Sequence, residues 1–311
     1  MNKAFVLGAG LGERLRPLTE QLPKPLIPVF HRPLMTYAFD HLRASGVGEF
    51  VVNTHHIPTA YDTAFPEHRY QGCPIRFRNE SPVRLETAGG IANVRDLLDG
   101  PDSFFVYNGD ILTDLPLAPL IAAHALNDNV VTLALRSRGP ALHIAFDEAR
   151  GVVTDIRNKL GSGNEGTHLF TGIYLVSPRF FDWLTPGKVE SVIPIFLKLI
   201  EAGHRVGAVA IDDGQWWDLG SRDAYLEAHR ANLGHSTFGT MVDLHPDASV
   251  SPQATLRGTN VIGPGATVGE GASLENCILW PDAHVAPGSQ LRRCIVRSHV
   301  LAQGVHENHD F

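Results

Sequence analysis

The residues best suited to chemistry follow the first apolar segment of the chain. Glycines at Gly8, Gly10 and Gly12 are followed closely by Arg14 and Arg16. Glycines at a strand end let backbone N–H groups converge on an anion, because no Cβ blocks the approach. The spacing does not fit a GxGxxG dinucleotide loop, and no Gly-Lys-Ser/Thr ending makes it a Walker A loop. The segment therefore predicts a phosphate-binding loop of another kind.

A lysine follows this loop. Lys24 lies between Pro23 and Pro25, and prolines restrict the backbone, so the ammonium group is expected to point in a defined direction. A glycine-rich turn with two solvated arginines is the alternative interpretation. Arg14 and the proline-flanked Lys24 together favour the phosphate site.

Two aspartates are candidate ligands of a metal ion. Asp110 ends an apolar run over residues 104–110, and Asp218 lies in a Trp-Trp-Asp-Leu-Gly-Ser segment. Carboxyl ends of strands face the site in open α/β sheets. Magnesium takes oxygen ligands and shares its shell with phosphates. Alternatively, Asp110 could cap the turn that follows it, and Asp218 could serve the helix expected to start near Ser221.

A second glycine-containing turn is expected to meet the nucleotide. Residues 86–91 read Glu-Thr-Ala-Gly-Gly-Ile and open a predicted helix, whose first N–H groups have no partner within the helix. Glu80 lies just upstream. A carboxylate only accepts hydrogen bonds, so it would suit guanine or uracil rather than adenine. A surface glutamate is an equally acceptable interpretation of Glu80.

Alternating short apolar runs and longer helical patterns must position these residues. Strands are predicted at residues 4–7, 50–53, 75–78, 104–107, 130–135, 169–176 and 206–211. Helices are predicted at residues 34–44, 88–98, 191–202 and 222–233. This order predicts an α/β fold, a Rossmann-like mostly parallel sheet with helices on both faces.

The pattern changes after about residue 240. Apolar residues recur there at intervals of six, at Leu244, Val250, Leu256, Ile262, Val268 and Leu274. The register slips by one near Leu279 and resumes at Val285 and Leu291. A six-residue apolar period is typical of a parallel β-helix. It resembles the hexapeptide repeat of left-handed β-helices, and about three coils fit this segment.

Composition narrows the class of protein. The chain has 311 residues, a net charge of −7, three cysteines without a CxxC pair, and no dense basic run. A long nucleic-acid footprint is not expected from this charge. No apolar stretch suits a signal peptide or a membrane span. We expect a soluble, cytoplasmic protein that uses no disulfide framework.

The combination GxGxRLxPLT…PKPL resembles the signature of sugar-1-phosphate nucleotidylyltransferases over about residues 3–233. The closest likeness is to mannose-1-phosphate guanylyltransferases and N-acetylmuramate-1-phosphate uridylyltransferases. The resemblance implies a catalytic domain over residues 1–235 and a short left-handed β-helix over residues 236–311. It also implies a nucleoside triphosphate and a sugar 1-phosphate as substrates, Mg²⁺ as cofactor, and a homo-oligomer.

The resemblance assigns roles residue by residue. Arg14 and Lys24 would be catalytic, and Asp110 and Asp218 would hold the metal. The nucleotide would contact Gly8, Ala9, Gly10, Gly12, Glu80, Thr87, Gly89 and Gly90. The sugar phosphate would contact Lys159, Gly172 and Glu190. Asn158 and Leu160 depart from the Glu-Lys-Pro of relatives around Lys159. Glu190 could equally be a helix-start carboxylate favoured by the helix dipole.

Several polar residues are assigned outside the site. His55 and His56 follow a predicted strand without an identifiable third metal ligand, so they are interpreted as structural or as pocket wall. Asp155 is expected on the exposed face of an alternating strand. The final residues 306–310 are expected to be a frayed, solvated end.

Two rival functions stay open. A catalytically silent regulatory or scaffold subunit could have the same fold, although Arg14, Lys24, Asp110 and Asp218 are all present. The β-helix could instead be an acyltransferase, but His284 and His299 have no identifiable partner.

Overall fold

The structure, a computed structural model, describes residues 1–234, 238 and 241–311. The chain forms two compact units, each made of two stretches of sequence. The first unit comprises Met1–Gly10 and Met35–Trp216, and the second comprises Leu11–Leu34 and Trp217–Phe311. The glycine-rich loop therefore passes from one unit to the other. A domain boundary at residue 235 stays a prediction.

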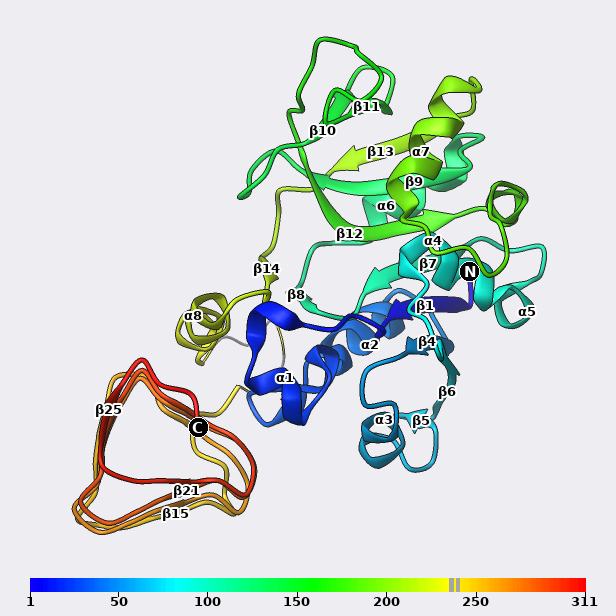
Figure 1. Cartoon of the computed structure of the whole chain (residues 1–311). Helices are drawn as coiled ribbons and strands as arrows, with labels where there is room; N and C mark the ends of the chain where they lie inside the picture. The colour runs from blue at the N-terminus through cyan, green and yellow to red at the C-terminus, as the bar shows by residue number, and fades with distance from the viewer. Residues whose placement is uncertain (235–237, 239–240) are drawn as a thin grey trace. The chain divides into compact units, whose positions relative to one another are not determined.

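The first unit is built on a ten-stranded sheet with the order β10-β11-β13-β9-β12-β7-β1-β4-β6-β5 (Figure 1). The strands are β1 Lys3–Leu7, β4 Glu49–Thr54, β5 Arg69–Tyr70, β6 Cys73–Asn79, β7 Phe104–Asn108, β9 Val131–Arg136, β10 Ile144–Asp147, β11 Val152–Ile156, β12 Leu169–Val176 and β13 Val206–Ala210. Strands β6, β4, β1 and β7 are parallel, while β12 runs antiparallel between β7 and β9. The expected α/β class is confirmed, with a sheet of mixed direction.

Helices of this unit bury apolar faces on the sheet. They are α2 Met35–Ala44, α3 Thr59–Ala64, α4 Glu86–Asn93, α5 Arg95–Leu98, α6 Ala118–Leu126 and α7 Val192–Glu201. A core that includes Phe5, Val106 and Tyr174 of the sheet continues into Ile91 of α4 and Phe196 of α7. The single helix expected over residues 88–98 is in fact two, because the backbone leaves helical geometry at Val94 (φ −109°, ψ 14°).

Parallel pairing brings the ends of the central strands to one edge. Leu7, the last residue of β1, pairs with Asn53 of β4 and with Asn108 of β7. Thr54 pairs with Asn79 at the end of β6. Gly8, Glu80 and Asp110 follow these strands directly, so they emerge at the same edge of the sheet.

The second unit begins with very short elements. They are η1 Glu13–Leu15, α1 Leu18–Gln21, η2 Lys24–Leu26, β2 Pro28–Val29 and β3 Arg32–Pro33. Helix α8, Arg222–Asn232, belongs to the same unit, and the Ser221 hydroxyl caps it by accepting a hydrogen bond from the Ala224 N–H. The remaining residues of this unit form the C-terminal repeat.

The C-terminal repeat is a β-helix of three parallel sheets, whose stacked coils are triangular in Figure 1. Its strands are β15 Ser249–Val250, β16 Thr255–Arg257, β17 Val261–Ile262, β18 Thr267–Val268, β19 Ser273–Glu275, β20 Ile278–Leu279, β21 His284–Val285, β22 Gln290–Arg292, β23 Ile295–Val296, β24 Leu301–Ala302 and β25 Val305–Glu307. Val250 pairs with Val268, whereas Ile262 pairs with Leu279. The first pair spans eighteen residues and the second spans seventeen, which explains the slip in the period.

The interior of the β-helix contains the periodic residues. Val268, Leu274, Leu279, Val285 and Leu291 are buried in one cluster. The frayed end expected for the last residues is wrong. Strand β25 pairs with β22, and the Phe311 N–H donates to the Ile295 carbonyl. Backbone pairing with the preceding coil is the physical reason. Among the described residues, no helix is long and apolar enough to span a bilayer.

Candidate active site

The start of the glycine-rich loop is held from behind by buried side chains. The Gly8 N–H donates to Asn53 Oδ1 over 2.8 Å, and the Tyr61 hydroxyl donates to the Gly8 carbonyl over 2.7 Å. A Cβ at Gly8 would lie 2.6 Å from the Asn53 carbonyl oxygen, so only glycine fits there. The Gly8 N–H is therefore used by the protein and is not available to an anion.

Glu80 completes this buried network. Its side chain is buried, Oε1 accepts from Asn53 Nδ2 over 2.7 Å, and Oε2 accepts from the Leu85 N–H over 2.8 Å. The surface interpretation of Glu80 is wrong, because parallel pairing of β6 with β4 places the residue beside Asn53. Recognition of a base by Glu80 stays a prediction. The network links the glycine-rich loop to the turn before α4.

The start of α4 packs closely against protein. The N–H groups of Ala88 and Gly89 donate to the Glu190 carbonyl over 2.8 and 3.2 Å. A Cβ at Gly89 would lie 2.2 Å from the Lys188 carbonyl oxygen, and one at Gly90 would lie 2.9 Å from Glu80 Oε1. Close packing therefore requires glycine at both positions. The N–H groups of Ala88 and Gly89, which were expected to lack partners, are hydrogen-bonded within the protein. Contact of Thr87, Gly89 and Gly90 with a nucleotide stays a prediction.

The Glu190 carboxylate also has protein partners. Its Oε1 lies 2.7 Å from Lys188 Nζ and 3.3 Å from Lys198 Nζ. These lysines lower the pKa of Glu190, with the Lys188 hydrogen bond as the largest cause. Helix α7 begins after Glu190 and is capped by Ser191. The Glu190 carboxylate is therefore held by two lysines, and its contact with the sugar stays a prediction.

Asp110 lies at the carboxyl edge of the sheet, near the glycine-rich loop. Burial raises the pKa of the Tyr61 hydroxyl, and the negative charge of Asp110 raises it further. Tyr61 is the donor to the Gly8 carbonyl, so Asp110 and the start of the loop share one neighbourhood. Gly172, at φ 83°, lies beside Asn108, since a Cβ there would be 2.5 Å from Asn108 Nδ2. Asp110 and Gly172 are therefore placed around Asn108 at the end of β7.

Lys159 lies in an exposed turn after β11. Asp155 organises this turn from a fully buried position, accepting hydrogen bonds from the N–H groups of Leu160 and Ser162. Burial by itself raises the pKa of Asp155, but the hydrogen bonds to backbone and Ser162 lower it overall. The exposed position expected for Asp155 is wrong. An alternating strand does not reveal that the following loop folds back over its outer face.

The second unit contains the basic residues. Lys24 Nζ lies 3.1 Å from Asp218 Oδ1, and Arg14 Nη2 lies 3.7 Å from Asp218 Oδ2. The Lys24 side chain is 6% exposed, whereas that of Arg14 is 74% exposed. The buried cation is fixed and the exposed one can move toward a ligand. We call Arg14, Lys24 and Asp218 the basic cluster.

Two glycines shape the basic cluster. Gly12 has φ 64°, and a Cβ there would lie 2.7 Å from Thr19 Cγ2 and 3.2 Å from Lys24 Cβ. A Cβ at Gly220 would lie 2.5 Å from Arg14 Nη2 and 2.9 Å from Asp218 Oδ1. Glycine at these positions lets the loop approach Lys24 and lets Arg14 reach Asp218.

The metal ligands expected from the sequence are Asp110 and Asp218. Among residues 1–234, 238 and 241–311, no group of three or more His, Cys, Asp or Glu side chains could hold a metal. Mg²⁺ is commonly bound through one or two carboxylates with water and substrate phosphates. In the second unit, the Asp218 carboxylate is partly exposed and pairs with Lys24 and Arg14. In the first unit, Asp110 lies just beyond the end of β7, and binding of Mg²⁺ by either residue stays a prediction.

The supporting residues were missed by sequence reasoning. Asn53, Tyr61 and Asp155 hold the glycine-rich loop and the Lys159 turn. No sequence motif marks Asn53 and Tyr61, because their hydrogen-bond partner Gly8 lies far away in the sequence. His55, by contrast, was interpreted as structural, and its Nδ1 lies 3.0 Å from the Glu80 carbonyl oxygen.

These features define a class: an α/β protein with a glycine-rich loop after its first strand and a set of basic side chains suited to phosphate. Residues 3–234 match the nucleotidyl transferase family, and the chain belongs to that family. The protein is thus a nucleotidyltransferase, as the sequence signature predicted. Its C-terminal β-helix follows the matched residues.

Two curated relatives are similar over most of their own length. A mannose-1-phosphate guanylyltransferase of Mycobacterium tuberculosis is 30% identical, over 93% of this chain and 83% of that protein. An N-acetylmuramate α-1-phosphate uridylyltransferase of Neisseria meningitidis is 31% identical, over 70% of this chain and 93% of its own. The inositol-1-phosphate CTP transferase structure from T. maritima has a TM-score of 0.61 at 19% identity, covering 72% of this chain and 91% of that one. This last likeness supports the fold.

Proposed function

We propose that the protein transfers a nucleotidyl group from a nucleoside triphosphate to a sugar 1-phosphate, releasing pyrophosphate. The basic cluster carries the proposal, because it places a buried lysine and an exposed arginine within 4 Å of one carboxylate. Family membership over residues 3–234 supports the reaction class. The substrates favoured are GTP with a mannose-1-phosphate-like sugar, or UTP with an amino-sugar or muramate 1-phosphate.

The reaction needs no protein nucleophile. A phosphate oxygen of the sugar phosphate attacks the α-phosphorus in line, and the bond from that phosphorus to the bridging oxygen of the β-phosphate breaks. The electron pair leaves with pyrophosphate. Such transfers depend on positioning and on neutralising charge. The protein therefore has to hold two anionic substrates together and stabilise the charge that develops.

Each charged side chain has a proposed role. Arg14, largely exposed, binds the triphosphate and the departing pyrophosphate. Lys24, buried and directed by its neighbours, binds the α-phosphate and the incoming phosphate. Asp218 orients both cations before substrate arrives. Lys159, in its exposed turn, binds the sugar phosphate, while Gly172 and Glu190 are proposed to line the sugar.

Magnesium is the proposed cofactor, with Asp110 and Asp218 as its protein ligands. When bound, the ion would neutralise charge on the phosphate oxygens. The backbone around Gly8, Ala9, Gly10 and Gly12 would surround the triphosphate. Thr87, Gly89 and Gly90 are proposed to approach the nucleotide, with Glu80 near the base. We also propose a cytoplasmic homo-oligomer with residues 1–235 as catalytic domain.

A matrix assay tests this function. Purified protein is incubated with Mg²⁺ and each common nucleoside triphosphate, crossed with glucose, mannose, N-acetylglucosamine and N-acetylmuramate 1-phosphates. Pyrophosphate release that requires both substrates is the expected result, with a nucleotide-sugar identified by mass spectrometry. No release from any pair would contradict the proposal and favour a catalytically silent subunit.

A further inference from the structure

We propose that the β-helix holds the segment Leu11–Leu34 in its catalytic conformation, with Gln21 and Arg297 as positioning residues. The inference rests on the proposed function, since it concerns how Arg14 and Lys24 are held. Every contact used below lies within the second compact unit, which contains both this segment and the β-helix.

The segment cannot hold its own conformation. Its three helical turns, η1, α1 and η2, have three, four and three residues. Isolated helices shorter than about 12 residues are marginal in water, because nucleation is costly. Strands β2 and β3 contribute two residues each. Contacts from outside the segment must therefore fix the position of Lys24.

The β-helix supplies two direct contacts before Lys24 in the sequence. The Gln21 side chain binds the backbone of Ser298 twice: Nε2 donates to the carbonyl over 2.9 Å, and Oε1 accepts from the N–H over 3.2 Å. Arg297 Nη1 donates to the Pro17 carbonyl over 3.1 Å. We call these three hydrogen bonds the anchoring contacts. They join the last complete coil to both ends of α1.

Arg297 is itself fixed within the last coil, where its Nε donates to the Phe311 carbonyl over 2.7 Å. Its Nη1 also lies 4.0 Å from the Glu20 carboxylate of the segment. The Arg297 side chain is 22% exposed. An arginine held at one nitrogen presents the rest of its planar fork in a defined direction. The contact with Pro17 is thus preorganised by the β-helix.

Helix α8 links the β-helix to the residues after Lys24. Trp280 Nε1 donates to the Tyr225 hydroxyl over 3.1 Å, and that hydroxyl donates to the Pro28 carbonyl. Two residues on, the Phe30 N–H donates to His229 Nε2 over 3.3 Å. The segment is thus held on both sides of Lys24.

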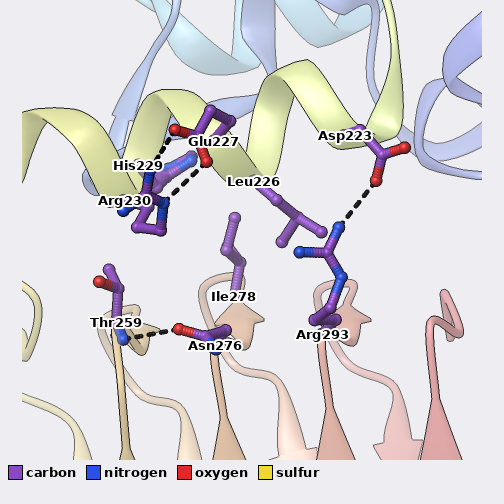
Figure 2. A pocket seen from close by; sticks show the side chains of 9 residues that line it. All are labelled: Asp223, Leu226, Glu227, His229, Arg230, Thr259, Asn276, Ile278 and Arg293. Atoms are coloured by element: carbon purple, nitrogen blue, oxygen red, sulfur yellow. Dashed lines mark hydrogen bonds and ion pairs between the residues drawn. The ribbon is translucent and has the colours of Figure 1, made fainter.

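Polar links attach α8 to the β-helix. Arg293 Nη2 lies 2.9 Å from Asp223 Oδ1, as Figure 2 shows, and Arg222 Nε lies 2.7 Å from Asp310 Oδ1. Between α8 and the coils a cavity of about 310 Å³ remains, with Leu226 and Ile278 in its wall. Around this cavity, the polar links and the Trp280–Tyr225 bond attach α8 to the β-helix.

The test compares substitutions at the anchoring contacts with matched controls in the full-length protein. Gln21→Met removes both hydrogen bonds to Ser298 and keeps the side-chain length. Arg297→Met removes the bond to Pro17 together with the contacts of Arg297 with Phe311 and Glu20. Gln253→Met and Arg292→Met are the controls. The Gln253 side chain contacts Ser251, and Arg292 pairs with Glu275 and Glu307, all within the β-helix.

The first readout does not depend on turnover. Lys24 is almost fully buried and paired with Asp218, so acetic anhydride should acylate it slowly in the parent protein. Mass spectrometry of peptides follows that rate, with Lys3 as internal reference. We expect severalfold faster acylation of Lys24 in Gln21→Met and Arg297→Met, and the parent rate in both controls.

The second readout is the split between kcat and KM. A misplacement of about 1 Å can cost on the order of 10²-fold in rate. We expect kcat to fall on the order of tenfold or more because Lys24 is displaced, and the KM for the triphosphate to rise by a smaller factor because Arg14 lies in the same segment. Partial unfolding would instead lower the fraction of active protein. Circular dichroism and the control variants detect such unfolding.

The outcomes separate the two proposals. Unchanged Lys24 acylation in Gln21→Met overturns the inference, as does the same effect in Gln253→Met. If Arg297→Met does not fold, the inference is still tested by Gln21→Met, because Gln21 is only half-buried. If the parent protein turns over no substrate pair, the proposed function fails, while Lys24 acylation still tests the role of the β-helix.

Discussion

At the scale of single residues, the charged side chains of the basic cluster differ mainly in exposure. Lys24 is buried against Asp218, and Arg14 reaches the same carboxylate from solvent. A buried ammonium group keeps its position without reorganising during the reaction, which is where preorganised charge acts most strongly. An exposed guanidinium can follow the departing pyrophosphate. The different burial of the two cations suits the different roles proposed for them.

Replacing Lys24 tests the basic cluster. Lys24→Met keeps most of the buried side-chain volume but removes the charge, so turnover should fall on the order of 10²–10³-fold. Pyrophosphate release measures the change, and circular dichroism checks that the fold is kept. Lys3→Met is the control, since Lys3 Nζ donates to the Leu97 carbonyl and is not part of the basic cluster. Parent-like turnover by Lys24→Met would remove Lys24 from the mechanism.

Glu80 offers a second prediction at this scale. Both carboxylate oxygens accept from donors, Asn53 Nδ2 and the Leu85 N–H. In Glu80→Gln one of these donors would face an amide NH₂ group, and a buried unsatisfied group costs about 1–3 kcal/mol. Urea unfolding should show this loss. Glu67→Gln, a substitution at an exposed position, should leave stability unchanged. Equal stability of the two variants would contradict the network.

At the scale of elements, the strands were predicted well from sequence. Each strand predicted from alternation or from a short apolar run is present, because burial on one or both sheet faces leaves a local pattern. The break between α4 and α5 was not predicted, since no proline or glycine marks Val94. The turn after β11 was also missed, because Asp155 organises it from a buried position that a strand pattern does not reveal.

Helix α8 provides a pH prediction. Burial lowers the pKa of His229 from 6.5 to about 4, so the folded protein keeps this imidazole neutral where the unfolded chain is protonated. Stability from this residue is full above pH 6.5 and is lost as the pH falls toward 4, by about 3 kcal/mol in total. Urea unfolding of parent and His229→Gln at several pH values measures it.

The expected result is a smaller loss of stability on acidification in His229→Gln than in the parent. His124, whose pKa burial likewise lowers to about 4, is present in both proteins and contributes the same slope to each. The difference between the two curves therefore isolates His229. Parallel curves between pH 7 and pH 4.5 would mean that His229 does not titrate with unfolding.

At the scale of the whole molecule, the compact units do not follow the order of the sequence, because each is made of two separate stretches of chain. Leu11–Leu34 lies early in the chain but belongs to the unit that contains the β-helix. The residues of one cooperative unit unfold together, and each unit has its own free energy of opening. The segment that contains Arg14 and Lys24 should therefore lose protection with the β-helix rather than with the ten-stranded sheet.

Core substitutions in each unit test this expectation. Leu274→Ala in the β-helix removes a fully buried side chain and should cost about 2–5 kcal/mol. Hydrogen exchange should then rise over Leu11–Leu34 together with the coils, while β1 and β7 keep their protection. Val106→Ala, in the core of the first unit, should give the opposite pattern. If Leu274→Ala leaves exchange in Leu11–Leu34 unchanged, the segment does not belong with the β-helix.

The sequence by itself determined the fold class, the family and the six-residue period, because each leaves a local or periodic pattern of residue types. It also pointed to Arg14, Lys24, Asp110 and Asp218, whose catalytic roles stay predictions. Only the tertiary structure decided the burial of Glu80 and Asp155 and the contacts of Gln21 with Ser298. Those depend on residues far apart in the chain, and no local pattern records which distant backbone a side chain will meet.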